Sequence, residues 1–204
     1  MEINYTKYNA KSLLEALGNI DAEAYPDNYQ NLTNEIASRK HEIQEFYAQQ
    51  AIAKKQRWSR LLTAISVSQL FVALTALSVL LLSISVLSAL EVVTSISVVL
   101  LNALSGIILY RRATKYYAIP YLNVALQTFA FGLGGMYFNY YGLGGAFLTF
   151  DWISESYNWL SLSFNLGGSL LQFSNEVELG FIQIDVLAFF YIWVIKKSLS
   201  QASS

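Results

Sequence analysis

Apolar residues dominate one long stretch of this chain, and charged residues stand at its two ends. From Leu61 to Tyr110, fifty residues include a single charged side chain, Glu91. A helix that crosses the hydrocarbon of a bilayer needs about 20 apolar residues, so this stretch has room for two crossings and a tight turn. The sequence predicts a transmembrane helical hairpin over 61–110, with Glu91 near its bend. The basic residues that flank it are Arg57, Arg60, Arg111, Arg112 and Lys115.

The basic residues also predict the orientation and the number of further crossings. Lys and Arg near membrane ends concentrate on the cytoplasmic side, so both ends of the hairpin are expected inside the cell. Lys196 and Lys197 place the C-terminus there too, which requires an even number of crossings after Lys115. We expect a third span over about 117–136 and a fourth over 179–195. The alternative has no crossing after the hairpin, and the second half is then a cytoplasmic β-rich domain on a two-helix anchor.

A glycine-rich, alternating pattern lies between these two expected spans. The tetrapeptide GLGG occurs twice, and from Leu160 to Leu166 apolar residues alternate with Ser or Asn. A period of two is typical of a half-buried strand. Gly167 and Gly168 fit a two-residue turn, so the sequence predicts a β-hairpin within a β-like segment over about 137–178. Because open sheet edges are not tolerated in hydrocarbon, this segment must lie outside it, lie against other protein or close on itself.

The first sixty residues, 1–60, have the pattern of a cytoplasmic helical head and stalk. Asn9 is a good cap for a short first helix, and Pro26 marks the start of a longer helix from Asp27. No helix breaker follows Asp27, so we expect this helix to run unbroken into the first span. It carries an apolar stripe at helical spacing, which either packs against the first helix or meets the stripes of other subunits in a coiled coil. The candidate residues for this partner or oligomer interface are Leu32, Ile36, Ile43 and Phe46.

The composition agrees with a membrane protein. Hydrophobic residues make up 54% of the 204 residues and charged residues only 13%, against roughly 25% charged in soluble domains. No basic residue lies between Lys115 and Lys196, so we expect no nucleic-acid binding by the second half, while the head leaves this question open. The expected fold is mainly α: a polytopic protein of the bacterial inner membrane, with both termini cytoplasmic, an N-terminal helical head, about four transmembrane helices and a small β-hairpin-containing segment in the second half.

Polar side chains inside the expected spans are candidates for a pore or a gate, because they are costly in hydrocarbon. Asp185, seven residues into the fourth span, is either an ion-path residue or a carboxylate hydrated from the outer end of a short helix. Asn123 and Gln127 are four positions apart on one helix face, so they either form interhelical hydrogen bonds or line a pore. The full set of pore or gate candidates is Asp185, Gln183, Asn123, Gln127 and Asn102.

Enzymatic chemistry has little support in the sequence. The chain has one histidine, His41, and no cysteine, so we expect neither a transition-metal site nor thiol chemistry. No general base accompanies the many serines, and an intramembrane aspartyl hydrolase needs two carboxylates in its spans where this chain offers one. The glycine-rich segments have neither phosphate-loop nor dinucleotide-binding order. We therefore expect no enzyme activity, no cofactor and no metal.

Two resemblances add to this interpretation. The run from Leu13 to Pro26, of the form LLxALxxID-x-E-x-YP, resembles a short helical module at the head of various bacterial proteins, many of them membrane-bound. In architecture, a small cytoplasmic helical head on a polytopic bundle, the chain is similar to channel-forming membrane effectors of bacterial phage-defence systems of the Hailong type. In those systems a nucleotidyltransferase makes a signal that controls an oligomeric membrane channel.

These resemblances imply a regulated pore. We expect a homo-oligomeric channel gated through the head, because four short spans in one subunit cannot enclose a conduit alone. The expected partners are the lipid bilayer, further copies of the chain, and a cytoplasmic regulatory ligand or partner protein. Two alternatives remain open: a non-conducting scaffold or accessory subunit of a larger complex, and a two-span anchor that carries a cytoplasmic β-rich ligand-binding domain.

Overall fold

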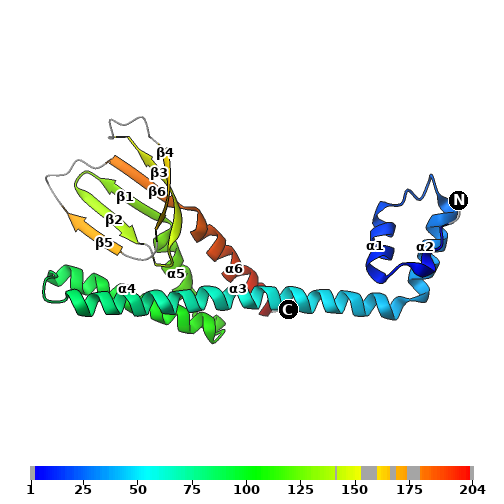
Figure 1. Cartoon of the computed structure of the whole chain (residues 1–204), viewed down its shortest axis with the longest axis horizontal. Coiled ribbons are helices and arrows are strands. Elements are labelled where there is room, and N and C mark those ends of the chain that lie inside the picture. Colours follow the sequence, from blue (N-terminus) through cyan, green and yellow to red (C-terminus); the bar gives the residue numbers. More distant parts are fainter. Residues whose placement is uncertain (1–2, 141, 153–159, 166–168, 174–179, 203–204) are drawn as a thin grey trace. The chain divides into compact units, whose positions relative to one another are not determined.

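The structure, a computed structural model (Figure 1), describes residues 3–140, 142–152, 160–165, 169–173 and 180–202. The chain divides into two compact units, Met1–Arg57 and Trp58–Ser204. We call them the N-terminal unit and the C-terminal unit. The long helix α3 (Lys40–Ser83) contributes to both.

The N-terminal unit is a small helical fold around three buried residues. A 3-10 turn η1 (Tyr5–Lys7) precedes α1 (Ala10–Asn19) and α2 (Pro26–Ser38). The Asn9 side chain accepts a hydrogen bond from the Ser12 backbone N–H at 2.9 Å and so caps α1, as predicted. The first helix folds back on the second, which is one of the two expected uses of the apolar stripe. The small core consists of Tyr5, Leu13 and Leu32, with Ala16, Leu17, Ile20 and Ile36 packed against it.

The helix expected to run unbroken from Asp27 is interrupted at Arg39, so this expectation is wrong. Arg39 has φ −105° and ψ 28° between α2 and α3. Its guanidinium donates hydrogen bonds to the Tyr8 carbonyl at 2.6 Å and to the Glu42 carboxylate at 2.6 and 2.7 Å. The neighbouring carboxylate of Glu42 raises the pKa of Arg39, which keeps the side chain charged. The break is associated with the contact between Arg39 and Tyr8, which are distant in sequence, and no glycine or proline marks it locally.

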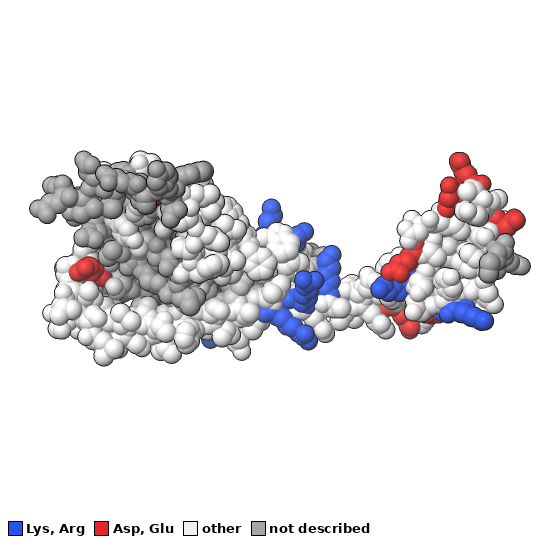
Figure 2. Space-filling view, turned by 45° about the horizontal axis from the view of Figure 1, so that its top comes forward, with Lys and Arg blue, Asp and Glu red and all other residues white. Residues whose placement is uncertain are grey.

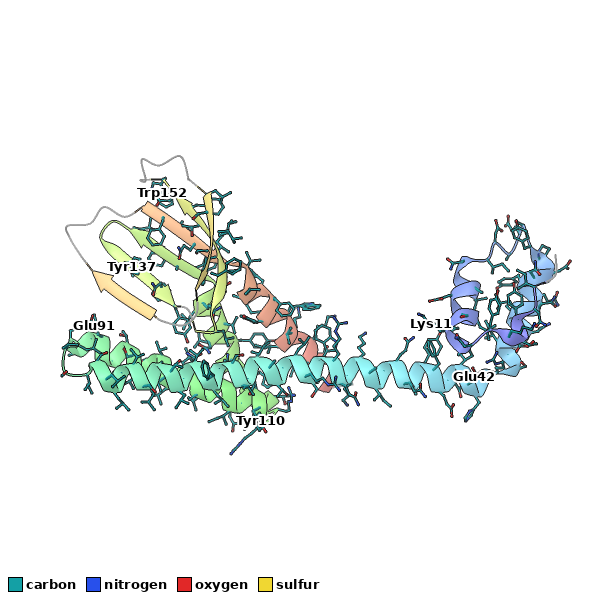
Figure 3. The ribbon with its side chains drawn as sticks, viewed as in Figure 1. Lys11, Glu42, Glu91, Tyr110, Tyr137 and Trp152 are labelled. Atoms are coloured by element: carbon teal, nitrogen blue, oxygen red, sulfur yellow. The ribbon has the colours of Figure 1, made fainter. Side chains whose placement is uncertain are left out.

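Two packed helices lie over the predicted hairpin, 61–110, and its crossing of a membrane stays a prediction. Among the described residues, α3 and α4 (Ala89–Tyr110) are the helices long and apolar enough to cross a membrane, which indicates membrane association. The Ser88 side chain accepts a hydrogen bond from the Glu91 N–H, and the Glu91 carboxylate accepts one from the Ser88 N–H at 2.8 Å. This capping box begins α4, so Glu91 stands at the bend as expected. Glu91 and Tyr110 mark the two ends of α4 in Figure 3.

The helices α3 and α4 approach each other closely at Gly106. The Ser66 hydroxyl donates a hydrogen bond to the Gly106 carbonyl at 2.8 Å. A Cβ built on Gly106 would lie 2.7 Å from Cγ of Leu70, so a larger residue would force the helices apart. Contact through small residues is the usual basis of helix packing in lipid, where the hydrophobic drive between helices is absent.

The second half of the chain contains an antiparallel sheet of order β4-β3-β6-β1-β2-β5. Both predicted strands of the expected β-hairpin exist, but the described ladder pairs β4 with β3 and β5 with β2, at opposite edges of the sheet. The expected pairing of the two strands with each other is therefore not the described one, and the predicted Gly167-Gly168 turn lies outside the described residues. The strands are β1 (Phe129–Leu133), β2 (Met136–Tyr140), β3 (Gly145–Asp151), β4 (Leu160–Asn165), β5 (Ser169–Phe173) and β6 (Gly180–Asp185).

The sheet is strongly curved. Four chain steps separate Asn165, the last residue of β4, from Ser169, the first residue of β5, and these can reach at most about 14 Å. In a flat sheet the edge strands would lie about 24 Å apart, because neighbouring strands are about 4.8 Å apart. The two edges must therefore bend toward each other, and the curvature is visible in Figure 1.

The expectation of four transmembrane helices is wrong. The expected third span, 117–136, is a ten-residue helix α5 (Ala118–Gln127) followed by β1. The expected fourth span, 179–195, is β6 followed by α6 (Val186–Ala202). Aromatic residues after Gln127 favour extended chain, glycines there disfavour helix, and Gly134 and Gly135, with φ of 52° and 84°, turn the chain between β1 and β2.

The core of the C-terminal unit joins the hairpin to α5 and α6. It contains residues from α3, α4 and both shorter helices, so these elements form one packed body. Its buried members are Leu62, Ile65, Ile108, Leu109, Tyr117, Val124, Leu143, Ala188, Val194 and Ile195.

Candidate functional site: a buried polar junction

Four of the five pore candidates meet where helices change into strands. β1 and β6 are neighbours in the sheet, so the change from α5 to β1 and the change from β6 to α6 lie side by side. The Asp185 N–H donates a hydrogen bond to the Thr128 carbonyl at 2.9 Å and so ties the two transitions together. We call this region the polar junction; its side chains belong to Asn102, Asn123, Gln127, Thr128, Tyr140 and Asp185.

Asp185 is wholly buried and fully engaged. Its Oδ1 accepts hydrogen bonds from the backbone N–H groups of Leu187 at 2.9 Å and Ala146 at 3.1 Å, and its Oδ2 accepts one from Gln127 Nε2 at 2.5 Å. The bond from Leu187 makes Asp185 the cap of α6. A Cβ built on Gly145 would lie 2.5 Å from Cγ of Asp185, so the carboxylate has room only because residue 145 is glycine.

Gln127 completes this half of the junction. Its Nε2 donates to the Gly144 carbonyl at 3.0 Å as well as to Asp185, and its Oε1 accepts from the Leu143 N–H at 2.7 Å. Gly144 has φ of 77°, a conformation that favours glycine. One amide side chain therefore satisfies the backbone of the turn before β3, and the chain can leave regular structure here without burying free polar groups.

Asn102, Asn123 and Tyr140 form a closed ring of hydrogen bonds in the other half. Asn102 Nδ2 donates to the Tyr140 hydroxyl at 3.0 Å, the Tyr140 hydroxyl donates to Asn123 Oδ1, and Asn123 Nδ2 donates to Asn102 Oδ1 at 3.1 Å. All three side chains are buried. The ring joins α4, α5 and β2, so it fixes the sheet against the middle of a candidate membrane helix.

Outside the junction, the sheet has two chemically distinct faces. Residues directly opposite on neighbouring strands share a face, and this register defines an outer and an inner face. Two rows of the outer face read Leu160–Phe150–Ile182–Phe131–Phe138 and Leu162–Leu148–Ile184–Phe129. The row between them, on the inner face, reads Ser161–Thr149–Gln183–Ala130.

Burial follows curvature and not polarity. Thr149 and Ala130 of the inner face are buried, whereas Leu162 of the outer face is 60% exposed and Phe164 on the same strand is 74% exposed. Tyr137 of β2, labelled in Figure 3, lies opposite Gly132 of β1, and Gly132 in turn lies opposite Phe181 of β6. The rings of Tyr137 and Phe181 stack edge-on, with 5.7 Å between their centroids. The exposed apolar side chains of the outer face thus lie chiefly along β4, and the inner face combines the polar row with aromatic residues, which are Tyr137, Phe147 and Phe181.

Gln183, the fifth pore candidate, stands apart from the junction on the inner face. Its Nε2 donates to Thr149 Oγ1 at 3.0 Å. Of the predicted interface residues, Leu32 lies in the N-terminal core with Ile36 packed beside it, and Ile43 is buried. Phe46 is half-buried, with its ring 6.1 Å from that of Tyr47. These stripe residues are thus largely used within one chain.

Sequence reasoning missed several members of the buried polar set. Tyr140 was not singled out, since nothing in a strand-like YFNYY run marks one tyrosine as buried. Gln69 of α3 is wholly buried, and neither atom of its amide has a hydrogen-bond partner in the described part of the chain; the same holds for the Ser105 hydroxyl of α4. Gln69 and Asn102 are the two amide residues of the fifty-residue apolar run, and this position was the available signal for Gln69.

The basic residues of the C-terminal unit gather at one end of α4. Arg112 donates hydrogen bonds to the Ser59 carbonyl at 2.7 Å and to Thr63 Oγ1 at 2.8 Å, which links the end of α4 to the middle of α3. Trp58 and Trp193 stack edge-on at 4.8 Å in the same region. Figure 2 shows the Lys and Arg side chains grouped together beside a broad surface without basic residues. Basic and aromatic side chains in one belt are typical of a membrane interface.

No metal-binding group of His, Cys, Asp or Glu side chains occurs in the part of the chain that the structure covers. Comparison of the chain with protein-family models, with curated proteins and with solved structures gives no match. The chemistry of its own residues is therefore the basis for a functional conclusion.

Proposed function

We propose that this chain is the subunit of a homo-oligomeric bacterial membrane channel, with both termini in the cytoplasm. The two apolar helices support insertion, and the grouping of Arg111, Arg112 and Lys115 at one end of the hairpin supports the orientation. Oligomerisation is part of the proposal, because two helices and a six-stranded sheet are too small to enclose an open conduit.

The polar inner face of the curved sheet is the observation that carries this proposal. A conduit needs polar groups facing a path inside otherwise apolar surroundings, and Thr149 and Gln183 provide such groups. The buried junction is less suited to this role, because the side chains of Asp185 and Gln127 already form hydrogen bonds with each other and with backbone groups. Asp151 at the end of β3, and the lack of basic residues between Lys115 and Lys196, favour cations over anions.

The N-terminal unit is the proposed regulatory part. A surface hollow of about 420 Å³ lies between the start of the chain and α2, lined by Asn4, Thr6, Asn31 and Glu35 among others. Its polar lining suits a small ligand with hydrogen-bonding groups. A ligand or partner protein that binds this unit would gate the channel, as the resemblance to Hailong-type phage-defence effectors implies.

Purification in mild detergent followed by reconstitution tests the channel proposal. We expect a discrete oligomer by light scattering and ion conductance in planar bilayers, with or without an added cytoplasmic activator. Gln183→Leu on the inner face should lower single-channel conductance severalfold, while Ile184→Leu on the outer face of the same strand should leave it unchanged. A monomer in detergent, or silent bilayers under every condition, would refute the proposal.

A non-conducting scaffold is the second candidate. It is favoured by the closed Asn102–Tyr140–Asn123 ring, which fixes β2 against α4 and α5 and so opposes movement of this strand relative to the hairpin. Under this alternative the chain co-purifies in fixed stoichiometry with a larger complex and bilayers stay silent.

A further inference from the structure

We propose that the outer face of the sheet is a lipid-contacting surface, so that the sheet lies within the thickness of the bilayer beside the hairpin. The partner is the acyl-chain region of the membrane. This inference extends the placement of the hairpin in the membrane and does not depend on whether the chain conducts ions.

The position of the sheet along the hairpin is the first argument. β5 packs against α4, and Tyr140 of β2 donates to and accepts from side chains at the level of Asn102, in the middle of α4. The sheet therefore lies alongside the candidate membrane helix and not beyond its end (Figure 1). If α4 crosses the hydrocarbon, the sheet shares its depth.

The inverted polarity of the sheet is the second argument. A sheet with one face in water buries its apolar side chains and exposes its polar ones. Here β4 exposes Leu160, Leu162 and Phe164, and the inner face buries Thr149 and Asn139. Apolar residues outward and polar residues inward, in alternation, are typical of strands that face lipid.

Lengths provide the third argument. The helix α4 has 22 residues and is about 33 Å long. The ten residues of α5 and the five of β1 together cover about 32 Å, and β6 with the part of α6 before Lys196 covers about 35 Å. Each matches a hydrocarbon core of about 30 Å with some tilt. On this inference the two segments cross the bilayer as helix–strand composites and not as the transmembrane helices expected from the sequence.

Backbone hydrogen bonding is the fourth argument. A change from helix to strand inside hydrocarbon is tolerated only where the freed backbone groups find partners within the protein. The polar junction supplies them: Asp185 serves the N–H groups of Leu187 and Ala146, and Gln127 serves the Leu143 N–H and the Gly144 carbonyl. The junction is what a composite span requires at the point where its structure changes.

The charge distribution agrees with this placement. No Lys or Arg lies between Lys115 and Lys196. The exposed face of α6 carries Phe189, Phe190 and Trp193 directly before Lys196 and Lys197, so the apolar surface of the sheet continues down α6 to the basic end of the unit.

Single-cysteine spin labelling tests the inference cleanly, because the native chain has no cysteine. Leu162→Cys and Phe164→Cys report on the outer face, and Ser163→Cys between them reports on the inner face. Leu74→Cys, in the middle of the apolar part of α3 at a position that is 62% exposed, is the lipid control, and Lys11→Cys in the N-terminal unit is the water control. Each full-length variant is reconstituted in vesicles of phosphatidylethanolamine and phosphatidylglycerol, and its collision rates with oxygen and with a polar nickel chelate are measured.

We expect labels at 162 and 164 to match the label at 74, with high oxygen and low nickel accessibility, and the label at 163 to depart from both neighbours. Nickel accessibility at 162 and 164 close to that at 11 would place the outer face in water and overturn the inference. Protection from both reagents would mean that protein covers this face, which also overturns it. Conductance is measured separately, so a silent channel with lipid-exposed labels would refute only the proposed function.

Discussion

The amide of Gln127 donates a hydrogen bond to the carboxylate of Asp185 at 2.5 Å, and both side chains are wholly buried. The two residues stand at the end of α5 and the end of β6, 58 positions apart in the chain. Their pairing holds together the points at which two helices change into two neighbouring strands. It makes Asp185 a structural group of the junction and explains how a carboxylate persists in an otherwise apolar unit.

Substitution of Asp185 should therefore act on stability before it acts on ion selectivity. In Asp185→Asn, an N–H₂ group would face either the Gln127 Nε2 donor or the backbone donors of Ala146 and Leu187. The expected loss in unfolding free energy is about 1–3 kcal/mol, and Asp185→Ala should lose more. Thermal unfolding in detergent, followed by circular dichroism, measures this. Asp151→Asn is the control; if Asp185→Asn were as stable as that control, the structural role would be wrong.

Gly145→Ala tests the packing of the same carboxylate. The new Cβ would lie 2.5 Å from Cγ of the buried Asp185 side chain, which cannot withdraw without losing its donors. We expect a loss of at least about 2 kcal/mol in stability, or a failure to purify as a discrete particle. Gly18→Ala is the matched control, because nothing lies within 4 Å of a Cβ there and alanine favours helix. Normal folding of Gly145→Ala would contradict the described geometry.

Several elements could be predicted from the sequence, each from a purely local signal. The long apolar run with its single charge predicted the hairpin, Glu91 predicted its bend, and Asn9 predicted the cap of α1. The pairing of strands, the break at Arg39 and the position of Tyr140 could not be predicted, because each depends on contacts between distant residues. The predictions of a third and a fourth transmembrane helix were wrong for a different reason. Hydropathy indicates burial and does not distinguish a helix from a helix that continues as a strand.

Tyr140→Phe probes the ring that joins the sheet to α4. Removal of the hydroxyl leaves Asn102 Nδ2 and Asn123 Oδ1 each without one partner, at a cost of about 1–3 kcal/mol. The double variant Tyr140→Phe with Asn123→Ala should lose less than the two single losses combined, since both remove the hydrogen bond between Tyr140 and Asn123. Tyr110→Phe, at an exposed position, is the control. Strict additivity in the unfolding measurements would show that the ring does not act as one unit.

Leu32→Ala distinguishes a core residue from a docking residue in the N-terminal unit. Leu32 is wholly buried against Leu13, so truncation should destabilise this unit by about 2–5 kcal/mol. Ile52→Ala, on the exposed surface of α3, should change stability little. Limited proteolysis of the full chain reports on local unfolding of α1 and α2. If the two variants resisted proteolysis equally, Leu32 would be a partner-contact residue and not a core residue.

The crossing of the bilayer by the hairpin is the central claim, and thiol labelling in intact bacterial cells tests it most directly. Ser85→Cys lies at the exposed bend between α3 and α4, and Thr114→Cys lies at the basic end of the unit. A membrane-impermeant maleimide should modify the cysteine at 85 in intact cells, and the cysteine at 114 only after permeabilisation. Equal protection of both positions in intact cells, with the protein recovered in the aqueous fraction, would contradict the account.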